Sequence, residues 1–252
     1  MRSVAAVWLA LLLLAAVAGR APGAGDPADV VARMDDLWRR RDQRGALEEQ
    51  VALGDRALAT DPDNYDATWR VARAYFWVAH LQSSRVLKKA MAGKAGELAQ
   101  RAMRQQPQRV EGHYVYAVAI AEYASSVGIV QAIVEGMGTK VEQAALDSYA
   151  RDPGFEQGGI ITLLGRYYFV LPWPKRDLER SRQYLEEVRS RFPQQLLSRC
   201  FLAETYRDLD EDDAARAELD FILANPPPPG APREEPDPMA CARDHMRRWF
   251  GR

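Results

Sequence analysis

The side chains that most often bind metals or act as nucleophiles are few and scattered in this sequence. Its only histidines are His80, His113 and His245, and its only cysteines are Cys200 and Cys241. No histidine belongs to an HExxH motif, and the cysteines are too far apart for a CxxC pair. We therefore expect no metal and no cofactor, and we interpret each histidine as a polar residue on or near a helix surface.

One acidic run has the spacing of a calcium loop. Asp208, Asp210 and Asp212 occupy alternate positions, as the first ligands of an EF-hand do. However, Asp213 stands where that loop needs glycine, and Leu219 stands where it needs a bidentate glutamate. We interpret the run as a solvated loop followed by the capped start of a helix.

Two other runs that could belong to a catalytic site do not match the motifs they suggest. The run Glu135–Lys140 contains two glycines and a lysine, but it does not follow the order GxxxxGK[ST] and no strand is predicted before it. Ser125 and Ser126 are not part of a GxSxG elbow. The sequence therefore predicts no catalytic residue and a function other than catalysis.

Composition narrows the class of partner. The 252 residues carry 34 Lys and Arg against 35 Asp and Glu, which gives a net charge of −1, and 47% of them are hydrophobic. A chain of this composition can fold, and it has no excess positive charge to attract nucleic acid. We expect a globular protein that does not bind nucleic acid.

The first residues have the pattern of a secretory signal. One charged residue, Arg2, is followed by an apolar run over residues 4–18 that is too short to span a bilayer and ends in small residues. We predict a signal peptide over residues 1–18, with cleavage as late as residue 25, and a periplasmic or secreted mature chain. No cysteine is present there for lipid attachment. In that oxidising compartment Cys200 and Cys241 either form a disulfide or remain buried thiols.

The elements that would position any site are repeated helix pairs. Helix-ending prolines recur with spacings that shorten to 34 residues, the period of the tetratricopeptide repeat (TPR), at Pro62, Pro107, Pro153, Pro193 and Pro226–Pro227. Small residues such as Ala72, Gly165 and Ala203 fall where helices must approach closely, and tyrosines follow three residues later. We predict an all-α, TPR-like superhelix with insertions in repeats two and three.

The predicted organisation is an α-solenoid over residues 27–225. Its five helix pairs are expected at 27–60, 65–105 with an insertion at 80–91, 109–151 with extra length at 125–138, 157–191 and 195–224. Seven prolines then indicate an extended linker over residues 226–238. A helix over residues 239–252 is expected to cap the open end of the stack.

Several runs resemble a known family. Those runs are Asp152–Phe155 with Gly158–Gly159, Leu164–Tyr168 with Leu171–Pro172, and Phe201–Tyr206. They resemble the TatT-like T-component proteins of TRAP transporters, over roughly residues 60–225. The resemblance implies an extracytoplasmic helical repeat protein that binds the transporter's solute receptor, often as a trimer with apolar openings. Family members are commonly lipoproteins, whereas this chain has no lipobox cysteine.

Candidate binding residues follow from the repeat register. The first helices of TPR-like repeats line the concave face. That register places six residues on this face and predicts that they contact a protein partner: Arg73, Trp77, Glu122, Arg166, Glu204 and Asp208. The alternative is that the charged residues pair between neighbouring helices and that Trp77 is core. The cluster Trp38–Arg41 is interpreted as a solvated helix end beside a packed tryptophan.

A second candidate surface is apolar. Ile129, Val130, Ile133 and Val134 recur at helical spacing between glycines. They either pack inside the superhelix or form a subunit contact or the lining of an apolar channel, and the second alternative requires an exposed patch.

Three functions remain open at this point. The first is a non-enzymatic periplasmic scaffold that binds a TRAP-type solute receptor. The second is an adaptor for envelope assembly or secretion that binds another protein. The third is a carrier of an apolar small molecule.

Overall fold

The structure, a computed structural model, describes residues 27–251, so the predicted signal peptide over residues 1–18 lies outside the described residues. Within that range all regular elements are helices, in this order: α1 Pro27–Arg39, α2 Ala46–Thr60, α3 Tyr65–His80, α4 Arg85–Gln105, α5 Val110–Val127, α6 Ile129–Val134, α7 Met137–Arg151, α8 Phe155–Val170, α9 Leu178–Arg191, α10 Leu196–Asp208, α11 Asp212–Ala224 and α12 Pro238–Phe250. The predicted all-α class is confirmed.

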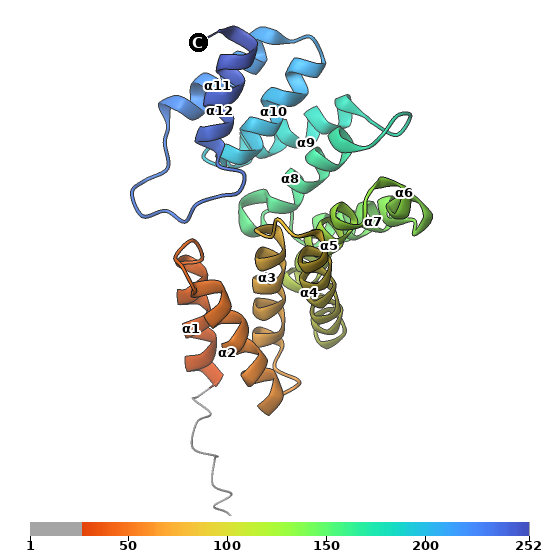
Figure 1. Cartoon of the computed structure of the whole chain (residues 1–252), viewed down its shortest axis with the longest axis vertical. Helices are drawn as coiled ribbons and strands as arrows, with labels where there is room; N and C mark the ends of the chain where they lie inside the picture. The colour runs from red at the N-terminus through yellow and green to blue at the C-terminus, as the bar shows by residue number, and fades with distance from the viewer. Residues whose placement is uncertain (1–26, 252) are drawn as a thin grey trace, which may run out of the picture.

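The helices form consecutive antiparallel pairs that stack on one another (Figure 1). The pairs are α1 with α2, α3 with α4, α5 with α7, α8 with α9, and α10 with α11. The insertion expected at residues 80–91 consists of a short loop over residues 81–84 and the first turns of α4, which has 21 residues. The extra length in the third pair consists of α6 and its flanking glycine turns.

Prolines determine where the second helices end. A residue before proline is pushed out of the helical region into extended backbone. This is the conformation of the residue that follows each of α2, α4, α7, α9 and α11, with ψ between 63° and 98°: Asp61, Gln106, Asp152, Phe192 and Asn225. Side chains cap several helix starts, as where Asn64 accepts a 2.9 Å hydrogen bond from the backbone N–H of Ala67.

Small residues set the distance between paired helices. Gly165 of α8 lies against α9, and a Cβ at this position would come within 2.5 Å of Leu185. Ala72, Ala95, Ala102, Ala203 and Ala215 are likewise inaccessible to solvent. These close approaches bury a continuous core through the stack.

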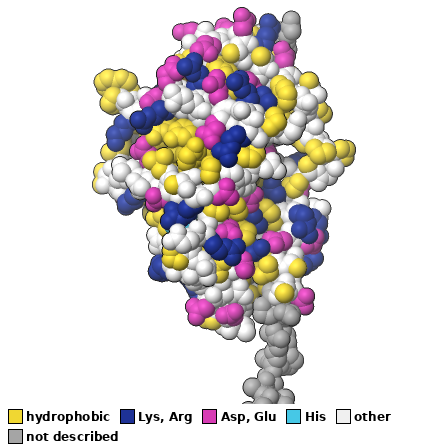
Figure 2. Space-filling view, turned by 180° about the vertical axis from the view of Figure 1, so that it is seen from behind, with side chains coloured by type: hydrophobic (Ala, Val, Ile, Leu, Met, Phe, Trp, Pro, Cys, Tyr) yellow, Lys and Arg dark blue, Asp and Glu magenta, His cyan; other side chains and the backbone are white. Residues whose placement is uncertain are grey.

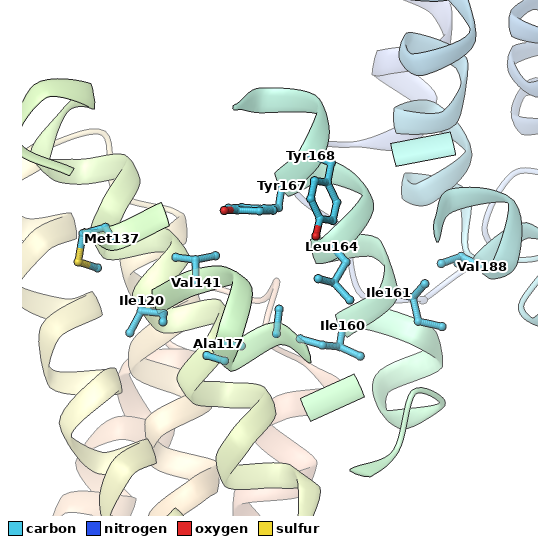
Figure 3. Packing of buried hydrophobic residues seen from close by; sticks show 12 residues of the cluster. Ala117, Ile120, Met137, Val141, Ile160, Ile161, Leu164, Tyr167, Tyr168 and Val188 are labelled. Atoms are coloured by element: carbon cyan, nitrogen blue, oxygen red, sulfur yellow. The ribbon is translucent and has the colours of Figure 1, made fainter. Parts of the chain in front are cut away.

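One core cluster joins the two halves of the molecule. Ile120 of α5 and Val141 of α7 face Ile160 and Leu164 of α8, and Val188 of α9 covers the far side of α8 (Figure 3). A second cluster packs α10 and α11 against α12 through Leu202, Leu219 and Met246, among others. The last helix therefore covers the end of the stack.

The segment between α11 and α12 does not continue the superhelix. Residues 225–237 leave α11 as an extended loop and descend toward the turn between α1 and α2 (Figure 1). Among the described residues, no helix is both long and apolar enough to cross a membrane.

Candidate functional site: a cavity on the inner helices

A cavity of about 810 Å³ lies among the first helices of successive repeats. α3, α5, α8 and α10 supply most of its wall, together with the end of α1, the α6–α7 region, the loop after α8 and residues 234–236 of the linker. Its volume is within the range of pockets that enclose a small molecule or several side chains of a peptide.

Stacked aromatic rings and guanidinium groups form one end of the cavity. Trp38 of α1 and Trp77 of α3 meet edge to face, with 5.8 Å between ring centroids. The guanidinium carbon of Arg73 lies 3.9 Å from the Trp38 centroid, and that of Arg41 lies 4.7 Å from it. Such cation–π contacts hold both arginines against the rings.

Arg73 joins three repeats. It forms an ion pair with Glu156 at the start of α8, lies 3.9 Å from a carboxylate oxygen of Asp35 in α1, and is only 5% exposed. Burial lowers the pKa of Arg73 because desolvation disfavours its charge, while Glu156 and Asp35 act in the opposite direction. Arg73 is therefore paired between helices, but with Glu156 of α8 and not with Glu122 of the neighbouring α5.

The backbone around Glu156 is unusual. Glu156 has φ 49° and Gln157 has φ 53°, so two residues with side chains adopt the left-handed conformation before α8 becomes regular. This conformation costs about 1–3 kcal/mol for such residues and persists where surrounding contacts enforce it. Here it accompanies the placement of the Glu156 carboxylate beside Arg73 in the cavity wall.

Arg41 has a different environment. Among the described residues it forms no ion pair; its Nη1 donates to the carbonyl of Trp38 at 3.3 Å, and its Nε is buried without a partner. Burial lowers the pKa of Arg41. Burial also raises the pKa of the nearby Glu234, one of whose carboxylate oxygens is buried without a partner. The cavity wall thus contains hydrogen-bonding capacity that the described part of the chain does not use.

A charged cluster connects the wall to the linker. The two ring nitrogens of His80 lie 2.8 Å from Oε2 of Glu122 and 2.9 Å from the carbonyl oxygen of Glu235. Lys88 donates to Oε1 of Glu122 at 2.5 Å. Burial alone would raise the pKa of Glu122, but the hydrogen bonds from His80 and Lys88 outweigh it and lower that pKa to about 2.

His80 is the centre of this cluster. Both of its partners are acceptors, so both ring nitrogens must donate, which only the imidazolium form does. Burial acts to lower the pKa of His80, yet its bonds to Glu122 and Glu235 raise it overall. The imidazolium therefore fastens the linker to α3 and α5.

The cavity has an apolar rim. Trp173, in the loop after α8, is 89% exposed and lines the cavity together with Ile133, which is 64% exposed. Val130 and Val134 of α6 are also exposed, so the alternative in which these three α6 residues pack inside the superhelix is wrong. In the view of Figure 2, apolar side chains lie between charged ones over the surface of the molecule.

The structure brings four of the six predicted binding residues into one cavity: Arg73, Trp77, Glu122 and Arg166. Glu204 and Asp208 do not line it. Glu204 forms an ion pair with Arg166, as the pairing alternative expected, and Asp208 pairs with Arg176 on the surface.

Sequence reasoning missed several lining residues. The sequence predicts a solvated helix end at Arg41, but this residue is partly buried and lines the cavity. Glu156 and Trp173 had no assigned role, because a left-handed turn and a loop have no helical period. The run Trp38–Arg41 could have predicted the aromatic end of the cavity, because a tryptophan beside arginines is also typical of a cation–π site.

Cys200 of α10 and Cys241 of α12 form a disulfide, with 6.5 Å between Cα atoms. Of the two alternatives left open by the sequence, the structure has the paired form. Glu204 and His245 lie beside the two sulfurs, so one histidine does belong to a group of potential metal ligands, contrary to the interpretation made from the sequence.

An all-helical stack of paired helices around a concave cavity defines a TPR-like protein, and solved structures support that class. A thermophilic TPR protein of Thermus thermophilus superposes with a TM-score of 0.67 at 16% identity, covering 88% of this chain and 99% of that one. MamA superposes with a TM-score of 0.50 at 13% identity, covering 72% of this chain and 90% of that one. These identities establish the fold alone.

Residues 30–171 match the family described as regulator of microtubule dynamics protein 1-3. This is more than half of the chain, which therefore belongs to that family. The matched region spans α1 to α8 and includes the aromatic end of the cavity. No curated protein sequence gives a significant match.

Proposed function

We propose that the protein is a non-enzymatic scaffold that binds a segment of another protein in the cavity of its inner helices. The observation that carries this proposal is the convergence of side chains from α1, α3, α5, α8 and α10 on one cavity. Aromatic and arginine side chains in a concave wall are the groups that dominate binding energy at protein interfaces.

The chemistry of the wall specifies the segment. Trp38, Trp77 and Trp173 offer apolar surface to aromatic or branched side chains, while Arg41 offers a guanidinium that no carboxylate of residues 27–251 binds directly. We expect the bound segment to combine an apolar side chain with a carboxylate. The carboxylate would bind the Arg41 guanidinium in its desolvated setting.

The partner that we favour is the solute-binding receptor of a TRAP-type transporter. The runs that resemble T-component proteins contribute Gly159, Arg166, Tyr167, Leu171 and Phe201 to the cavity wall. A disulfide between α10 and α12 suits the extracytoplasmic location that the predicted signal peptide implies. An adaptor for envelope assembly would use the same cavity for a different protein.

Affinity capture from an extract of the source cell, followed by measurement of the dissociation constant with the purified partner, tests this function. Trp173→Ala and Arg41→Gln should each weaken binding, by about 30-fold if either residue is a binding hot spot. Val86→Ala is the matched control, because Val86 is 78% exposed and lies outside the cavity. Unchanged affinity in both cavity variants would remove the cavity from the interface.

A second candidate function is transport or storage of an apolar small molecule. The observation in its favour is the volume of about 810 Å³ with mostly apolar lining residues. Native mass spectrometry of the purified chain should then show a bound mass that organic solvent extracts. The absence of such a mass, together with partner capture, would favour the scaffold.

A further inference from the structure

Four potential metal ligands converge between α10 and α12. Cys200 and Glu204 are four residues apart on α10, and Cys241 and His245 are four residues apart on α12. This spacing places both members of each pair on one face of their helix. The two sulfurs, a carboxylate oxygen and an imidazole nitrogen all lie within 4.8 Å of one another.

We propose that the dithiol form of this cluster is a zinc site, with Cys200, Cys241, His245 and Glu204 as its four ligands. Thiolate, imidazole and carboxylate are the ligands that zinc takes in tetrahedral sites. Bond lengths of about 2.0–2.3 Å place ligand atoms of such a site roughly 3.3–3.8 Å apart. Zinc binding therefore requires the widest separation to shorten by about 1 Å, and it requires the two sulfurs, once reduced, to move apart to about 3.8 Å.

The surroundings already orient the carboxylate. Arg166 binds Oε2 of Glu204, which leaves Oε1 directed at Nε2 of His245 at 3.0 Å. A charged partner on the outer oxygen is the usual support for a carboxylate that binds metal through one oxygen.

The imidazole is also held in place. The His245 ring stacks on Trp249 with 4.1 Å between centroids, and the residue is only 8% exposed. One contact must change: Arg248 lies 3.3 Å from Nδ1, which has to carry the proton when Nε2 binds zinc. The Arg248 side chain is 59% exposed and has room to turn into solvent. Arg248→Ala should therefore leave zinc affinity unchanged or increase it.

The disulfide and the zinc site are alternative states of the same sulfurs. A cellular dithiol that reduces the pair supplies two electrons and two protons and becomes a disulfide itself. Zinc then displaces two thiol protons and binds two thiolates. A plain structural disulfide requires neither the carboxylate nor the imidazole, so their placement is what points to metal.

The test uses the full chain reduced with a phosphine, stripped of metal and titrated with Co²⁺ in the absence of oxygen. We expect one equivalent of Co²⁺ to bind with thiolate-to-metal charge-transfer absorption and the visible bands of a tetrahedral ion, and Zn²⁺ to displace it. The oxidised chain should give neither signal. Absence of the bands in the reduced chain, whether it is folded or unfolded by circular dichroism, would overturn the proposal.

Variants assign the ligands. Cys200→Ser and Cys241→Ser should abolish the charge-transfer band, while His245→Ala and Glu204→Gln should weaken Zn²⁺ binding by at least about tenfold. His113→Ala is the matched control, because His113 is a buried histidine outside the cluster. If His245→Ala or Glu204→Gln binds Zn²⁺ as tightly as the parent chain, the four-ligand site is wrong.

Discussion

Single residues set the spacing of this stack, and Gly165 is the clearest case. A Cβ here would meet Leu185 at 2.5 Å, so Gly165→Ala should lower the free energy of unfolding by about 1–3 kcal/mol through overpacking. Gly93→Ala in α4 is the matched control: its Cβ meets nothing within 4 Å, and it should stabilise by about 0.5–1 kcal/mol. Urea denaturation measures both changes. Equal effects would mean that α9 retreats freely from α8.

Arg73 is a second residue with a structural consequence. Arg73→Gln leaves Glu156 without its cation, while Asp35 keeps its 2.8 Å ion pair with Arg70, so we expect a loss of about 3 kcal/mol of folding free energy. Arg39→Gln, on an exposed arginine of α1, should change it by less than about 0.5 kcal/mol. Thermal unfolding distinguishes the two. A stable Arg73→Gln chain that binds its partner weakly would instead make Arg73 a contact residue.

At the scale of elements, the strength with which the linker is bound to α3 should depend on pH. Because the pKa of His80 is raised in the folded chain, its stabilisation of the linker contact is complete below about pH 6.5. This stabilisation is lost as pH rises through the folded pKa. Because the pKa of Glu122 is lowered, its stabilisation of the same contact is complete above about pH 4.5. This stabilisation is lost as pH falls toward 2. Lys88 faces the same carboxylate. The linker should be held most firmly between pH 4.5 and 6.5.

Trypsin cleavage after the exposed Arg233 measures how firmly the linker is held. At each pH the parent chain is compared with His80→Gln, so that the response of the protease itself cancels. The parent should be cut more slowly below pH 6.5 and approach the rate of the variant at higher pH. Equal rates at all pH values would show that His80 does not fasten the linker, and His113→Gln serves as the control.

The helix pairs could be predicted from the sequence, whereas the route of the linker could not. Proline spacing and small residues predicted the helix pairs, because both act within one helix or between neighbours in sequence. The route of residues 225–237 back to α3 could not be predicted, because it depends on the hydrogen bond between His80 and Glu235, which lie 155 residues apart. The left-handed turn at Glu156 was missed for the same reason, since Arg73 of a distant helix is its partner.

At the scale of the whole molecule, the apolar patch of α6 should mediate self-association. Val130 and Val134 are 73% and 80% exposed, so replacing both with Glu should not affect stability beyond about 0.5 kcal/mol per residue. Sedimentation velocity of the parent should show an oligomer that this double variant reduces to monomer. Val86→Glu is the matched control on α4. A monomeric parent chain would contradict the trimer that the resemblance implies.

The return of the linker has a further consequence for how the chain unfolds. Open solenoids lose their terminal repeats independently, because each repeat contacts only its neighbours. Here the hydrogen bond between His80 and Glu235 connects the linker before α12 to the second repeat, so the C-terminal helices and that repeat share one contact. Fraying of α12 should therefore loosen α3 as well, and the C-terminal helices and the second repeat should unfold as one cooperative unit.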